Sequence, residues 1–110
     1  MKKVGIIRCQ QTEDLCAGTK DFTIAPQGKL AFEQTGPAEI VGFVSCGGCP
    51  GKKAIPRAKV MVERGAEAIA FTSCIAKGTP IGYPCPHYEA IRDAVTNAVG
   101  EDVQILGYTH

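Results

Sequence analysis

The sequence predicts an α/β fold in which a four-stranded parallel sheet carries helices on both faces. Short apolar runs alternate along the chain with segments of helical period, a pattern typical of β-α-β units. The apolar runs are continuous rather than alternating, as expected of strands buried on both faces. With 45% apolar and 21% charged residues in 110, the composition is that of a globular protein. We therefore expect a single domain, residues 1–110, that forms a three-layer sandwich of the flavodoxin-like or Rossmann-like type.

Four apolar runs supply the predicted strands, and they cover residues 4–9, 39–45, 67–73 and 102–107. Parallel strands joined through helices almost always have right-handed connections. We expect the strand order 2-1-3-4, because it creates a topological switch point between the first and third strands. Open α/β sheets bind their ligands at such a point.

Two segments show a clear helical period. Residues 52–64 carry apolar side chains at helical spacing and stop at Gly65, and residues 86–99 do the same before Gly100. Both segments are predicted to be helices on the faces of the sheet.

The first third of the chain is less regular. Residues 10–23 have no clean period, so we expect a long loop that holds Cys16. A short helix is expected over residues 25–34, beginning near Pro26, because proline is well tolerated in a first helical turn.

Charge and leader pattern exclude several classes of partner. The formal net charge is only +1, which offers no electrostatic footprint for nucleic acid. The apolar run of residues 4–7 is interrupted by Arg8 and is too short for a signal peptide or a membrane span. We therefore expect a cytoplasmic protein with no membrane partner and with reduced thiols, in which clustered cysteines are metal ligands or catalytic groups rather than disulfides. The sequence identifies no protein partner.

Cysteines follow three of the four predicted strands, namely Cys9, Cys46 and Cys74. The carboxyl ends of parallel strands lie on one edge, and neighbouring strands are about 4.8 Å apart, so thiols there can share one centre. A single cysteine at a strand end is more often a small buried hydrophobic residue. Three equivalent positions together predict a shared thiol site instead.

The most distinctive motif is Cys46-Gly-Gly-Cys49, which lies between a predicted strand and a predicted helix. Two thiols at this spacing can chelate a metal ion, cycle between dithiol and disulfide, or hold two corners of an iron–sulfur cluster. The nearby helix start, together with Lys52 and Lys53, favours the thiolate form of Cys49.

Further candidate ligands lie on the loops that follow the same strand ends, and they are Cys16, Cys85 and His87. His87 is as readily a surface residue at a helix start as a ligand. At the end of the chain, His110 is expected to be disordered rather than liganding.

These residues leave three functions open. The first is a transition-metal site, with zinc as the expected ion, built by Cys9, Cys46, Cys49 and Cys74 and completed or partly replaced by Cys85 and His87. The second is an iron–sulfur cluster held by the same sulfur atoms. The third is a thiol-disulfide oxidoreductase in which Cys46 and Cys49 cycle and Cys74 or Cys9 resolves.

The whole chain resembles the CGGC-domain family of small bacterial and archaeal proteins. The resemblance rests on the motif Cys46 to Cys49 and on segments 8–14, 73–74, 84–88 and 108–110, together with Cys16. It implies a metal-binding, zinc-type protein and carries no established activity. Many family members have a further cysteine near Asp21, which this chain lacks.

Overall fold

The computed structural model describes residues 1–10, 17–78 and 84–110 and contains a sheet of four parallel strands. The strand order is β2-β1-β3-β4, which confirms the predicted fold class and order. The strands are β1 (Lys2–Arg8), β2 (Ala38–Ser45), β3 (Ala68–Phe71) and β4 (Gln104–Leu106).

Burial explains why the central strands read as continuous apolar runs. All four residues of β3 are buried, and so are residues 4–7 of β1. The edge strand β2 is more exposed. Gly5 and Gly42 let the covering helix approach closely, because a Cβ at either position would lie within 2.8 Å of the Met61 sulfur.

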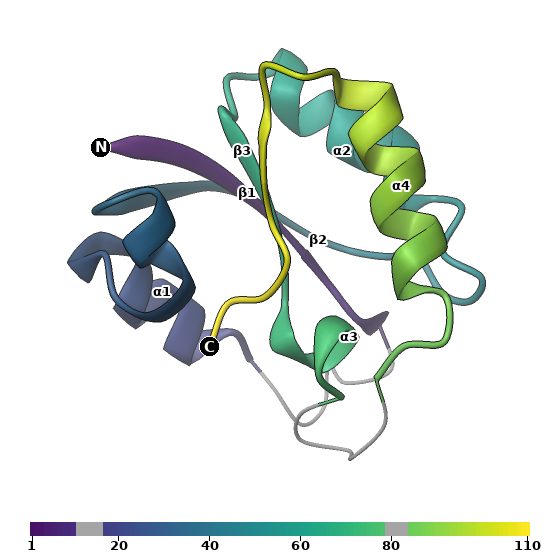
Figure 1. Cartoon of the computed structure of the whole chain (residues 1–110), viewed down its shortest axis with the longest axis horizontal. Coiled ribbons are helices and arrows are strands. Elements are labelled where there is room, and N and C mark those ends of the chain that lie inside the picture. Colours follow the sequence, from purple (N-terminus) through teal and green to yellow (C-terminus); the bar gives the residue numbers. More distant parts are fainter. Residues whose placement is uncertain (11–16, 79–83) are drawn as a thin grey trace.

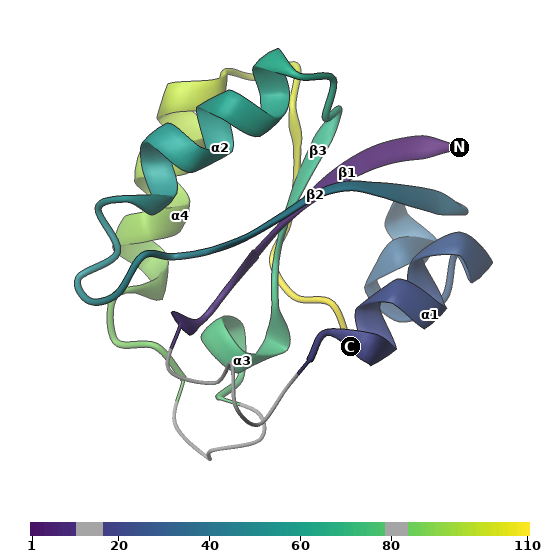
Figure 2. The ribbon, with the colours of Figure 1, turned by 180° about the vertical axis from the view of Figure 1, so that it is seen from behind.

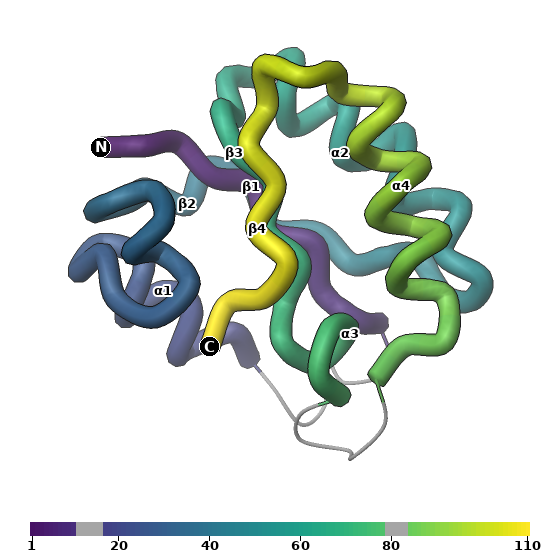
Figure 3. Tube along the Cα trace, in the orientation of Figure 1, coloured from purple at the N-terminus to yellow at the C-terminus, as the bar shows by residue number. Residues whose placement is uncertain are grey.

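Helices cover both faces of the sheet, which makes the molecule three-layered (Figures 1 and 2). On one face lie α2 (Ala54–Glu63) and α4 (Tyr88–Val99), and on the other lie α1 (Thr19–Gln27) and the 3-10 helix η2 (Leu30–Gln34). The short helix α3 (Ser73–Ala76) sits at the carboxyl edge of the sheet. Beyond β4 the chain returns to the α1 side, as the tube in Figure 3 shows.

The prediction of a loop over residues 10–23 is wrong for its last part, because α1 begins at Thr19. The helical pattern was hidden by Asp21, a charged residue that α1 buries together with Ile24 and Ala25. A buried acid is rare enough that the sequence pattern gave no apolar face to recognise.

The helix predicted over residues 25–34 is also wrong in its bounds. Pro26 lies near the end of α1 rather than at a helix start. Gly28 ends α1 in the left-handed conformation, and the backbone N–H groups of Gly28 and Lys29 donate to the carbonyls of Ala25 and Ile24. The chain therefore turns at Gly28, and a separate 3-10 helix follows.

The two clearer helix predictions are confirmed with shorter bounds, since α2 and α4 start two residues later than expected. The longest helix in the described ranges, α4, has 12 residues. No helix in these ranges is long and apolar enough to cross a membrane.

Candidate functional site

Two cysteines extend neighbouring strands at the carboxyl edge of the sheet. Arg8 and Ser45 are partners in the β1–β2 register, and Cys9 and Cys46 follow them directly. The backbone N–H of Cys46 donates to the carbonyl of Arg8 at 2.7 Å, so the ladder continues one step beyond the strands. The predicted juxtaposition of Cys9 and Cys46 on one edge is therefore present in the backbone.

The loop of residues 46–49 takes a conformation that depends on glycine. Gly47 and Gly48 have φ angles of 81° and 94°, in the left-handed region. A Cβ on Gly47 would lie 2.5 Å from the Cβ of Lys53, at the start of α2. The two central glycines of the motif thus let the chain fold back against the helix that follows.

Arg57 of α2 anchors the start of this loop. Its Nη1 donates to the carbonyl oxygen and to the hydroxyl of Ser45, at 3.0 Å in each case. The Ser45 hydroxyl also accepts the backbone N–H of Gly47 at 3.2 Å. Ser45 and Arg57 together hold the two-thiol loop at the end of β2.

The fourth thiol of this edge, that of Cys85, comes from a segment distant in sequence from the other three. Cys85 precedes α4, and its backbone N–H donates to the carbonyl of Ile75 at 2.8 Å. Burial raises the pKa of the Cys85 thiol, against a hydrogen bond from the backbone N–H of His87. The thiolates of Cys49, Cys46 and Cys9 also raise this pKa, because they repel the thiolate of Cys85.

We call these four residues, Cys9, Cys46, Cys49 and Cys85, the thiol rim. Their surroundings differ, because Cys46 is buried, Cys9 and Cys85 are half-buried and Cys49 is exposed. Cys46 belongs to the core cluster under α2 and α4, and Cys9 and Cys85 pack against that cluster. The thiol rim thus runs from the core to solvent.

Cys74 lies on the same edge but does not end a strand as predicted. Strand β3 stops at Phe71, and the carbonyl of Thr72 then accepts the backbone N–H groups of Ile75 and Ala76, which begins α3. Cys74 is 5% exposed, and its sulfur is 2.7 Å from the hydroxyl of Thr72. Because of this short helical turn, Cys74 does not continue the direction of β3, and the Cys74 thiol contacts Thr72.

His87 occupies the N-cap position of α4 and is half-buried. It lines a cavity of about 240 Å³ between the 50–52 segment and α4. His87 follows Cys85 by two residues, and its role as a ligand stays a prediction.

Cys16, the other predicted ligand, lies outside the described residues. Among residues 1–10, 17–78 and 84–110, no three His, Cys, Asp or Glu side chains stand close enough together to hold a metal ion. The donors of the thiol rim match zinc in chemical type, whereas their spacing in this structure is wider than a bound ion requires.

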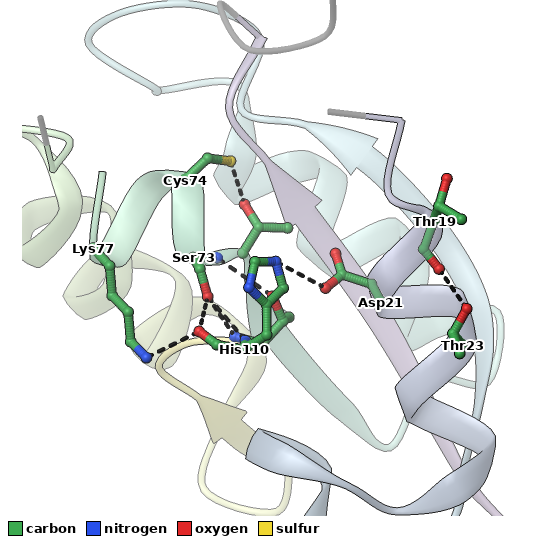
Figure 4. A network of polar contacts seen from close by, with 9 residues as sticks. Thr19, Asp21, Thr23, Ser73, Cys74, Lys77 and His110 are labelled. Carbon is green, nitrogen blue, oxygen red and sulfur yellow. Dashed lines mark hydrogen bonds and ion pairs between the residues drawn. The ribbon is translucent and has the colours of Figure 1, made fainter. Parts of the chain in front are cut away.

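A polar network at the same edge was missed by sequence reasoning (Figure 4). Its centre is Asp21 of α1, which is 2% exposed and faces the imidazole of His110, with 3.9 Å between Oδ1 and Nε2. Contrary to the expectation of disorder, His110 is held by Ser73, whose hydroxyl donates to the His110 carbonyl at 2.6 Å and accepts its backbone N–H at 2.9 Å. Lys77 adds a hydrogen bond to the same carbonyl at 2.9 Å.

Thr109 links Ser73 to Asp21. The Thr109 hydroxyl accepts the backbone N–H of Ser73 at 3.3 Å and hydrogen-bonds the Asp21 carboxyl. Within the described part of the chain, Asp21 Oδ1 is a buried oxygen with no hydrogen-bond partner. Burying such an atom costs free energy of desolvation, and van der Waals packing does not offset this cost.

Burial shifts both titrating groups of this network toward their neutral forms. It raises the pKa of the Asp21 carboxyl, although Thr109 and the positive charges of His110, Arg8 and Lys20 act in the opposite direction. Burial lowers the pKa of His110, despite the opposing charge of Asp21. Burial thus disfavours the ion-pair form of the contact between the two side chains. No pattern in the sequence could have revealed the network, because the burial of Asp21 with Ile24 and Ala25 is known only from the structure.

Comparison with known proteins agrees with the motif. The family model of the CGGC domain matches residues 3–110. A protein of Methanocaldococcus jannaschii titled as uncharacterised is 32% identical over 109 aligned residues, which span 94% of this chain and 80% of the relative. No solved structure matches the chain significantly. The chain belongs to the CGGC domain family.

Proposed function

We propose that this protein binds a zinc ion through the thiol rim. The observation that carries the proposal is the backbone arrangement, in which Cys9 and Cys46 extend the neighbouring strands β1 and β2 and the two-thiol loop follows directly with Cys49. Burial is the main cause of the raised pKa of Cys85, and the charges of the other three thiols add to it. Family membership supports the same class of function.

The chemistry of the donors favours a soft or borderline metal. Four thiolates satisfy the tetrahedral preference of Zn²⁺, with Zn–S bonds of about 2.3 Å. Bringing thiolates together without a cation is unfavourable, because like charges repel. A divalent cation neutralises this repulsion, so binding displaces the thiol protons.

The proposal entails that the thiol rim closes when the ion binds, because its donors are not gathered within ligating distance in the described structure. Cys49 is the most exposed donor of the thiol rim, and it follows two glycines. His87 is placed to supply a nitrogen ligand in place of one sulfur, because it follows Cys85 by two residues.

The proposal is tested by metal analysis of protein purified without oxygen, followed by titration with Co²⁺ as a spectroscopic substitute for zinc. We expect one zinc ion per chain and an absorption band from thiolate-to-cobalt charge transfer. Replacing Cys46 or Cys85 by serine should weaken zinc binding by more than about 10-fold, since even outer partners of a metal site have effects of that size. Cys74→Ala is the matched control, and it should keep the stoichiometry because that thiol contacts Thr72.

Three outcomes contradict the proposal. Protein with no metal above trace levels and no cobalt band is not a metal protein of this type. Iron and inorganic sulfide in equal amounts assign the thiol rim to an iron–sulfur cluster. A Cys46–Cys49 disulfide that forms and is reduced reversibly in metal-free protein, while Zn²⁺ does not bind, assigns it to thiol-disulfide exchange.

A further inference from the structure

A groove lies beside the thiol rim, and none of the four cysteines lines it. It has a volume of about 240 Å³ and is bounded by the segment after Cys49 on one side and by α4 on the other. Its walls include Ile55 of α2 and Ala90 and Ala94 of α4. A concave apolar site with a few polar groups at its mouth is the usual form of a small-molecule site.

The groove is held in shape by a close contact between its two walls. Gly51 has a φ angle of 87°, and a Cβ at this position would overlap the side chain of Ile91 in α4. The backbone N–H of Gly51 donates to the carbonyl of Gly48 at 2.7 Å, which ties this wall to the two-thiol loop. The groove therefore does not need to be opened by a ligand.

The polar groups at the groove are basic. Lys52 and His87 line it, and none of its lining residues in the described part of the chain is acidic. The positive end of the α4 dipole lies at the same place, because His87 is the N-cap of this 12-residue helix. Glu89 is exposed in the first turn of α4 but does not line the groove.

We propose that this groove binds a small aliphatic carboxylate, with the carboxylate at Lys52 and His87 and the alkyl chain along Ile55, Ala90 and Ala94. Charge complementarity selects an anionic head, and the apolar walls select an unbranched or lightly branched chain. The bound molecule lies next to the segments that carry Cys49 and Cys85, which makes it a neighbour of the thiol rim. The proposal does not depend on a bound metal, so its failure and that of the zinc proposal are distinguishable.

The test uses three probes of equal chain length on metal-free, reduced protein, with binding followed by chemical-shift changes of backbone amides in NMR. We expect hexanoate to bind with a dissociation constant on the order of 1 mM, as for a small ligand of this size. Hexan-1-ol should bind about 3-fold more weakly, because it loses an exposed ammonium–carboxylate contact, which has an effect of that size. Hexylamine should bind more weakly still, because its charge has the same sign as that of Lys52. The shifts should map to residues 50–55 and 87–94.

Matched variants separate the charge from the cavity. Lys52→Gln should weaken hexanoate binding by about 3-fold and leave hexan-1-ol binding unchanged. Lys53→Gln, the same charge change one residue along, should leave both unchanged because Lys53 does not line the groove. Ala94→Leu should abolish binding of all three probes by filling the groove, whereas Asn97→Leu, on an exposed position of the same helix, should not.

Several results would overturn the inference. Hexylamine binding as tightly as hexanoate removes the charge argument, and so does an equal effect of Lys52→Gln and Lys53→Gln. Saturable binding that survives Ala94→Leu places the ligand elsewhere. Tighter binding of acetyl-Gly-Leu than of hexanoate assigns the groove to a peptide carboxyl terminus, and absence of shifts at 20 times the expected dissociation constant removes the site altogether.

Discussion

The carboxylate oxygen Oδ1 of Asp21 faces Nε2 of His110 across 3.9 Å, although α1 lies near the start of the chain and His110 lies beyond the last strand. This separation is too long for a hydrogen bond, and Asp21 is almost completely buried. Burial therefore destabilises the charged form of the Asp21 carboxyl group. The stability of the fold should consequently depend on pH in a direction that can be worked out.

Asp21→Asn should raise the stability of the protein relative to wild type, and by more at neutral pH than at acidic pH. Burial raises the folded-state pKa of Asp21 above the ordinary value of 3.8. As pH rises above 3.8 the unfolded chain ionises first, so the wild-type protein loses stability until the raised folded-state pKa is passed. The advantage of Asn should grow over that window, by at most about 1.4 kcal/mol per pH unit, and then stay constant.

Urea unfolding of both proteins from pH 3 to pH 8 measures this difference. The difference between the two proteins at each pH reports the carboxyl group together with its charge effect on His110. Asp93→Asn, an exposed position on α4, is the matched control and should show no comparable pH dependence. A difference between wild type and Asp21→Asn that shrinks as pH rises contradicts the direction of the pKa shift.

Ser73→Ala should destabilise the fold by about 1–3 kcal/mol, because the Ser73 hydroxyl both donates to and accepts from the backbone of His110 in a fully buried position. The loss should appear first as faster amide hydrogen exchange at Thr109 and His110. Thr96→Ala removes an exposed hydroxyl that bonds the carbonyl of Arg92 in its own helix, and it should change stability by less than about 0.5 kcal/mol. Equal effects of the two substitutions would show that the Ser73 contacts contribute nothing to stability.

Gly47→Ala should destabilise the two-thiol loop more than a left-handed backbone alone explains. Gly36 supplies the control, since its φ angle is 72° and a Cβ there meets nothing within 4 Å, whereas at Gly47 it would press on Lys53. Gly36→Ala should cost about 1 kcal/mol from backbone strain, and Gly47→Ala clearly more. Only Gly47→Ala should also weaken zinc binding, as measured by competition with a chromophoric chelator. The same affinity for both variants would mean that the loop shape does not govern the thiol rim.

Arg57→Gln should loosen the same loop from its other end. The guanidinium of Arg57 donates to both oxygens of Ser45, so its loss leaves those acceptors without this donor and should cost about 1–2 kcal/mol. Arg64→Gln removes an equal charge from an exposed position just after α2 and should be nearly neutral. Chemical denaturation gives the stabilities, and alkylation rates of Cys46 report the loosening. Unchanged alkylation of Cys46 in Arg57→Gln argues against the anchoring role.

The sequence by itself determined the sheet, its order and the edge on which the cysteines gather. Continuous apolar runs mark β1 and β3 because these strands are covered on both sides, and helical periods mark α2 and α4 because each of these helices buries one face. Topology then brings Cys9 beside Cys46, since both follow paired strands. These features follow from local patterns that repeat along the chain.

Only the tertiary structure decided how the polar residues at that edge are used. Asp21 is buried because Thr109 and His110 meet it from beyond β4, and Cys74 contacts Thr72 because α3 starts immediately after β3. Such contacts join residues far apart in sequence, or depend on one helical turn, so no periodicity announces them. The cost of burying a polar group depends on the partner it finds, and the partner is known only when the chain has folded.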